Sequence, residues 1–155
     1  MQTLLSKPLK LQFHQKIKSA LPDFRKVGTD FGGVIYRQHD ETGQRYIFIF
    51  LSPSPKLDRF TVELAVNSVP QYPFEILPGD KIERGAARQR IRQFFPNSGD
   101  GWWNLNRSHE IEPNISLHLQ DRGDVQAALS KIPAAVQDAI EKVCGALPKF
   151  IRSLE

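Results

Sequence analysis

The chain has 155 residues, of which 40% are hydrophobic, and its 21 lysines and arginines exceed its 17 acidic residues to give a net charge of +4. A chain of this length suits one domain over 1–155, and its longest apolar runs are much shorter than the ~18–20 residues of a membrane-spanning helix. The single cysteine, Cys144, excludes an internal disulfide and the usual cysteine zinc site. Because the N-terminal segment also lacks the apolar core of a signal peptide, we expect a cytoplasmic protein without membrane contact.

The first predicted element is a helix over residues 4–21. Its apolar side chains recur at spacings of three to four residues, at Leu5, Leu9, Phe13, Ile17 and Ala20. Pro22 follows at the point where such a helix would end. The opposite side carries a set of basic side chains, namely Lys7, Lys10, His14 and Lys18. We therefore predict an amphipathic helix with a basic outer face, which by itself is most often a solvated face.

Three strands are predicted to follow in a row. Two of them, at about 31–38 and 46–52, flank a polar turn, and the third is the alternating run RFTVELAVN at 59–67. In that third run Phe60, Val62, Leu64 and Val66 would point inward. The run YIFIFL at 46–51 is apolar at every position, which predicts a strand covered on both faces. Short links between the strands favour an antiparallel meander.

The second half of the chain is predicted to be more irregular before a final helix. The run KIERGAARQRIRQFF at 81–95 has the character of a short helix, and a fourth strand would lie at Trp102–Leu105 or at Ile115–Leu119. The fold class is therefore α+β, with an antiparallel sheet of three to five strands and N-terminal and C-terminal helices packed on it.

The final helix is predicted from an apolar stripe that runs from Val136 to Leu154 and takes in Cys144 as a small core residue. Ser130 is the expected N-cap, with Pro133 in the first turn. Gly145 and Pro148 should interrupt or bend the helix.

The order of these features resembles a known family. The segment FRKVG at 24–28, the strand FTVELAV, the RIR at 90–92 and the run DGWWNL at 100–105 together resemble the bacterial Domain of Unknown Function 4304 family, with its Asp-x-Trp-Trp-x-Leu motif. The resemblance covers residues 4–106. It implies an α+β fold, a bacterial origin and a link to bacterial conflict systems. It transfers no catalytic residues, because the family has no established activity.

A binding surface is predicted from two neighbouring motifs. On the helix expected at 81–95, Arg84, Arg88 and Arg92 would share one face and could hold phosphates or carboxylates, although a solvated face is the simpler interpretation. Trp102 and Trp103 would point to opposite faces of a strand. We expect one tryptophan to anchor the core and the other to lie near the arginines as part of a binding surface.

No catalytic motif is present in the sequence, and we therefore expect no cofactor, no metal and no enzymatic activity. The best alternative location for an unrecognised enzyme site is a cluster near the middle of the second half, namely His109, Glu110, Glu112, His118 and Asp121. The favoured function is a small non-enzymatic bacterial protein that binds another protein, as an immunity or toxin-neutralising protein does. Its basic charge favours a neutral or acidic toxin. The other alternative is a nucleic-acid-binding accessory domain with weak, non-specific binding.

Overall fold

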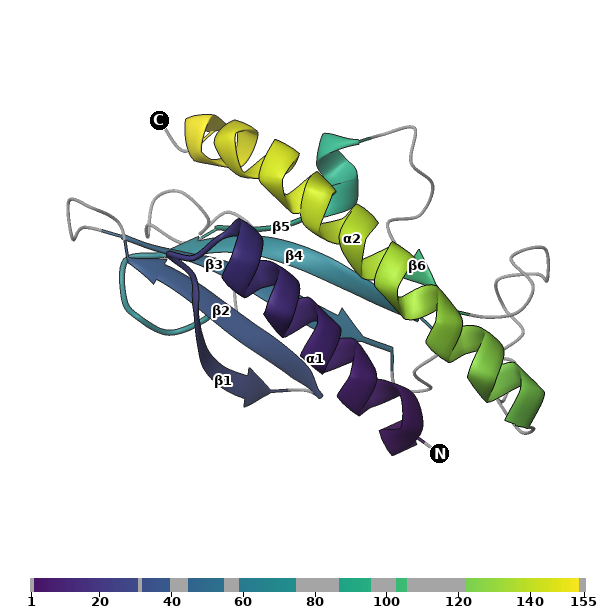
Figure 1. Cartoon of the computed structure of the whole chain (residues 1–155). Helices are drawn as coiled ribbons and strands as arrows, with labels where there is room; N and C mark the ends of the chain where they lie inside the picture. The colour runs from purple at the N-terminus through teal and green to yellow at the C-terminus, as the bar shows by residue number, and fades with distance from the viewer. Residues whose placement is uncertain are drawn as a thin grey trace.

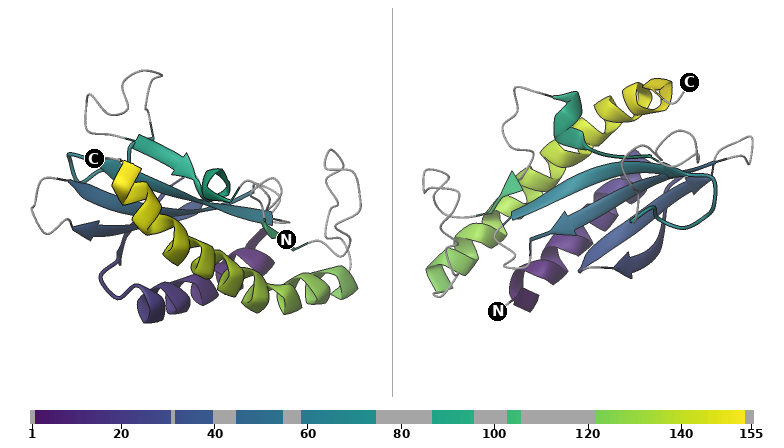
Figure 2. Two further views of the ribbon diagram at one scale, coloured as in Figure 1. Left: turned by 90° about the horizontal axis from the view of Figure 1, so that it is seen from above. Right: turned by 180° about the vertical axis from the view of Figure 1, so that it is seen from behind.

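The computed structural model describes residues 2–30, 32–39, 45–54, 59–74, 87–95, 103–105 and 122–153. Two long helices lie on one face of an antiparallel sheet, side by side (Figures 1 and 2). The predicted α+β class is confirmed. The elements are α1 (Gln2–Ala20), β1 (Arg25–Asp30), β2 (Gly33–His39), β3 (Tyr46–Pro53), β4 (Arg59–Asn67), β5 (Ala87–Arg90), the 3-10 turn η1 (Ile91–Phe94), β6 (Trp103–Asn104) and α2 (Arg122–Ser153).

The sheet follows the chain, with strand order β1-β2-β3-β4-β5 and every neighbouring pair antiparallel. The predicted meander of β2, β3 and β4 is therefore confirmed. The two-residue β6 pairs with β4 in addition, through Phe60 and Trp103. β1 was not predicted from the sequence, and its pairing with β2 is interrupted by a bulge between Lys26 and Gly28.

The main core lies between the helices and the near face of the sheet. The four side chains of β4 that were predicted to point inward, Phe60, Val62, Leu64 and Val66, are all buried there. From α1 the core receives Leu9, Phe13 and Ile17, while Ala20 at the end of the helix is exposed, contrary to prediction. Because the two helices also contact one another, they and the sheet enclose one continuous apolar cluster.

A second, smaller core covers the far face of the sheet. Phe48 and Phe50 of β3 are buried on this side against aromatic rings of the segment that follows β4. The ring centroids of Phe48 and Tyr72 lie 5.6 Å apart, and those of Phe50 and Phe74 lie 5.4 Å apart. The prediction that β3 is covered on both faces is confirmed.

The final helix differs from its prediction at its start and in its continuity. It begins at Arg122, so Ser130 lies inside it and donates through Oγ to the carbonyl of Ala127 instead of capping the helix. Pro133 and Pro148 both lie within α2, which continues to Ser153. Each proline removes a backbone donor, but buried side chains on either side keep the helix packed along its length.

Cys144 is exposed, and the prediction that it is a core residue is wrong. The buried stripe of α2 runs through Val143, Ala146 and Leu147. Cys144 follows Val143 by one residue, a rotation of about 100° around the helix, which turns its side chain away from the core.

The predicted helix at 81–95 is also wrong in its described part. Residues 87–90 form β5, and residues 91–94 form η1. Pairing of β5 with β4 satisfies the backbone and places Ala87 against the main core. This tertiary pairing outweighs the helical propensity of the sequence.

Candidate functional site

The structure does not bring Arg88 and Trp103 together. Arg88 lies opposite Ala65 and so faces the far side of the sheet, whereas Trp103 lies opposite Phe60 on the side of the helices. Because residues 87–94 are not an α-helix, Arg88 and Arg92 do not share a helical face. Arg84 and Trp102 lie outside the described residues, and so does the side chain of Arg92.

Arg88 and its neighbour Arg90 interact with the fold itself. Arg88 donates through Nη1 to the carbonyl of Phe74 at 2.9 Å, and its Nε lies 4.0 Å from Oε2 of Glu63. Nε of Arg90 lies 3.7 Å from Oε1 of the same carboxylate. The hydroxyl of Tyr72 donates to Glu63 at 3.1 Å, and burial together with the Glu63 charge raises the pKa of the Tyr72 phenol. These contacts fix the segment after β4 onto the sheet.

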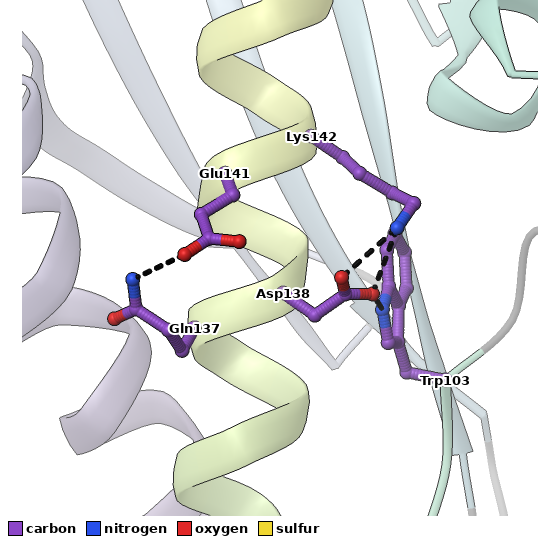
Figure 3. Close-up of polar contacts among 5 residues, drawn as sticks. All are labelled: Trp103, Gln137, Asp138, Glu141 and Lys142. Carbon is purple, nitrogen blue, oxygen red and sulfur yellow. Dashed lines mark hydrogen bonds and ion pairs between the residues drawn. The ribbon is translucent and has the colours of Figure 1, made fainter.

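Trp103 joins β6 to α2 through a polar contact at the edge of the core (Figure 3). Its ring stacks on Phe60 with centroids 5.4 Å apart, and its indole nitrogen donates to Oδ2 of Asp138 at 2.8 Å. Lys142 donates to both oxygens of Asp138, at 2.9 and 3.0 Å. Trp103 therefore anchors this segment, as expected for one member of the tryptophan pair. The surface role expected for the other member, Trp102, stays a prediction.

A pocket lies on the other helix, between α1 and the first two strands. Its volume is about 490 Å³. We call it the Lys pocket, and its lining residues are Lys7, Lys10, Leu11, His14, Lys26, Val34 and Tyr36.

Two sequence spacings build the Lys pocket. Lys7, Lys10 and His14 recur at intervals of three and four residues, so they share one side of α1. Lys26 is the register partner of Tyr36, and paired residues of antiparallel strands point to the same face of a sheet. Tyr36 belongs to the main core beneath the helices, so Lys26 points to the side on which α1 lies.

The base of the pocket is apolar, with one polar pair. Val34 and Tyr36 are each only 1% exposed, whereas Leu11 is 56% exposed. The Tyr36 hydroxyl and Nδ1 of His14 share a hydrogen bond of 3.3 Å, and the two rings stack with centroids 5.9 Å apart. Burial raises the pKa of the Tyr36 phenol, so the hydroxyl keeps its proton at neutral pH.

The lysines give the pocket a positive charge that no ion pair among the described residues balances. Within the described part of the chain, no carboxylate forms an ion pair with Lys7, Lys10 or Lys26. Three lysines from two elements that line one pocket favour a negatively charged ligand. The arrangement can therefore hold a negatively charged group above an apolar base.

Sequence reasoning found only part of this site. The basic face of α1 was predicted with Lys7, Lys10 and His14, while Lys18 on the same face does not line the pocket. Lys26 was missed because the segment RKVGTD has no apolar alternation that would identify it as a strand.

The described residues contain neither a metal-binding cluster nor a membrane-spanning helix. Among them, no group of three or more histidine, cysteine, aspartate or glutamate side chains could hold a metal ion. The cluster around His109 and His118 lies outside the described residues. No described helix is long and apolar enough to cross a membrane.

No family model, curated protein or solved structure matches the chain. The resemblance to the Domain of Unknown Function 4304 family therefore stays a prediction, and the function is argued from the Lys pocket.

Proposed function

We propose that this chain is a small non-enzymatic bacterial protein that binds an acidic partner protein through the Lys pocket, in the manner of an immunity protein. The observation that supports the proposal is that Lys7, Lys10 and Lys26 line one pocket together with the exposed Leu11, with no ion-pair partner for these lysines among the described residues. A pocket that combines an exposed apolar side chain with lysines is suited to a partner that presents an apolar residue among carboxylates.

The pocket is better suited to a protein than to a nucleic acid. Proteins that bind single-stranded nucleic acids combine basic side chains with exposed rings on which bases stack. The Tyr36 ring is buried, and His14 already stacks on it. Leu11, the most exposed apolar residue of the lining, is suited to an apolar protein surface. Any nucleic-acid binding would then be the weak, salt-sensitive kind that lysines provide.

The side chains of the pocket also support binding over catalysis. The lining contains an imidazole and a phenol but no carboxylate, thiol or serine hydroxyl. Without a carboxylate, thiol or serine hydroxyl, the lining lacks the nucleophile–base–carboxylate set of the serine and cysteine hydrolases. Ammonium groups and an apolar base are, in contrast, what recognition of an acidic surface requires.

A charge-reversal experiment tests the proposal. The tagged full chain, the variant Lys7→Glu/Lys10→Glu and the matched control Lys16→Glu/Lys18→Glu would each be incubated with extract of the source cells, with and without nuclease. The control makes the same charge change on α1, at positions that do not line the pocket. We expect one acidic protein, recovered in stoichiometric amount by the wild type and by the control and lost with the pocket variant. Recovery that depends on nucleic acid, or that the pocket variant retains, would contradict the proposal.

A further inference from the structure

We propose that the Lys pocket binds a small amphipathic anion, in which a carboxylate or phosphate is joined to a short apolar body. This inference uses the same pocket as the proposed function and names the chemical group that the pocket recognises. It does not require the partner to be a whole protein.

The anionic half of the ligand is specified by charge from two elements. Lys7 and Lys10 come from α1 and Lys26 comes from β1, so a bound anion would bridge the helix and the edge strand. Lysine is a flexible point charge with three donors, and it accepts either a carboxylate or a phosphate. The lysines therefore select the ligand by its negative charge and not by the shape of its anionic group.

The apolar half of the ligand is specified by the apolar residues that line the pocket. Val34 and the Tyr36 ring form a base that is closed to solvent, and Leu11 stands beside it with more than half of its surface in water. A simple anion would leave Leu11 exposed to water. A ligand with an apolar body would cover Leu11 and remove it from water, which is favourable in proportion to the apolar area buried.

The pocket is open to solvent and has room for a small ligand. A volume of about 490 Å³ lies within the range of about 300–1,000 Å³ typical of small-molecule sites. The protonated Tyr36 hydroxyl is held by His14 and adds one fixed polar group at the base. The chemistry fits a free short-chain or aromatic acid, and it fits equally the apolar C-terminal residue of a protein with its free carboxylate.

Titration of the isotopically labelled full chain, followed by amide NMR shifts, tests the inference. The probes are hexanoate and phenyl phosphate. Hexanol tests the apolar half of the ligand without the anion, and inorganic phosphate tests the anion without the apolar half. We expect shifts in residues 7–14 of α1 and in β1 and β2, and binding of either half alone that is at least about tenfold weaker than that of the whole probe. A heptapeptide ending in leucine is compared with the same peptide carrying a C-terminal amide and with hexanoate. Their affinities show whether the pocket prefers the C-terminus of a protein or a free acid.

Two test variants and one control make the test specific to the pocket. Lys26→Gln and Leu11→Asn should each weaken hexanoate by about five- to tenfold, while Lys18→Gln on the same helix as Leu11 should leave it unchanged. Inorganic phosphate that binds as tightly as phenyl phosphate, or Lys18→Gln that weakens hexanoate as much as Lys26→Gln, would overturn the inference.

The outcome is separable from that of the proposed function. If the Lys7→Glu/Lys10→Glu variant loses the partner and no probe changes the amide NMR shifts, the proposed function stands and the amphipathic-anion site is refuted. Specific binding of hexanoate, with no partner lost on charge reversal, would support this inference and refute the proposed function.

Discussion

The indole nitrogen of Trp103 donates to Asp138 at 2.8 Å, and this contact joins a strand of two residues to the middle of the last helix. β6 pairs with β4 at only two positions, which is too little pairing to hold a strand by itself. The contact with Asp138 and the stacking of Trp103 on Phe60 therefore supply much of what fixes β6 in place.

Substitution of Trp103 should separate these two contributions. Trp103→Phe keeps an aromatic ring on Phe60 but removes the donor to Asp138, so the free energy of unfolding should fall by about 1 kcal/mol. Trp103→Ala removes both, and the loss should approach the ~3–5 kcal/mol seen for large aromatic truncations in cores. Denaturant unfolding of the two variants shows whether Trp103→Ala loses more stability than Trp103→Phe. Equal losses would show that the ring contributes nothing beyond its hydrogen bond.

Asp138 should make stability depend on pH in acid. Burial alone would raise the pKa of its carboxyl, but the hydrogen bonds from Trp103 and Lys142 and the Lys142 charge together lower it below the ordinary value of 3.8. The folded state therefore binds the proton less readily than the unfolded state. The stabilisation is complete well above pH 3.8 and is lost as pH falls below 3.8, through the lower pKa of the folded protein.

The variant Asp138→Asn isolates this effect. It should lower the melting temperature at neutral pH, and the difference from the wild type should shrink as pH falls below the ordinary value of 3.8. Because the side chain of Asp138 is 48% exposed, the difference at neutral pH should be at most about 1 kcal/mol. A difference that grows in acid would contradict the pKa direction.

The elements that the sequence predicted well are those with a strong apolar periodicity. α1 and the three strands of the meander have strong apolar patterns, and each lies within a few residues of its prediction. The segment at 81–95 has a helical composition, but its residues 87–90 pair with β4 as a strand. A local sequence pattern cannot reveal this pairing. The length of α2 could not be predicted for a similar reason, because packing along its buried stripe holds the helix through Pro133 and Pro148.

The candidate site was predictable only in its helical part. Lys7, Lys10 and His14 share a face by helical spacing, which a sequence displays directly. Lys26 and Tyr36 join them through strand register, and that register depends on a bulge that follows Lys26. In its described part the predicted arginine surface differs from the prediction, because residues 87–90 pair with β4 as a strand and place Arg88 on the face of the sheet opposite to Trp103.

Gly33 at the start of β2 should be a sensitive position. A Cβ added there would contact the backbone carbonyl of Leu51 and lie 2.8 Å from two ring carbons of Phe50. The carbonyl cannot move easily because Leu51 is paired within the sheet. Gly33→Ala should therefore lower the free energy of unfolding by about 1–3 kcal/mol.

Gly28→Ala is the matched control for Gly33→Ala, because a Cβ at Gly28 meets no atom within 4 Å. It should change stability by less than about 1 kcal/mol. Thermal unfolding compares the two variants, and a larger loss for Gly28→Ala would contradict the packing around Gly33.

Tyr36→Phe should show what the hydroxyl at the base of the Lys pocket does. The ring is buried and keeps its packing against Phe13, so removal of the hydroxyl takes away only the bond to His14. The cost in stability should be about 0.5–1.5 kcal/mol. Amide and imidazole NMR signals should change at His14 and stay unchanged at Trp103. Widespread shifts would show that the hydroxyl also supports the core.

The central claim is that the Lys pocket is the binding surface, and mapping of the captured partner onto the chain by amide NMR shifts tests it most directly. We expect the largest shifts at residues 7–14 of α1 and along β1 and β2, with loss of these shifts in Lys7→Glu/Lys10→Glu. Shifts centred on Trp103 and α2, or on Arg88 and the far face of the sheet, would contradict the claim and restore the surface that the sequence predicted.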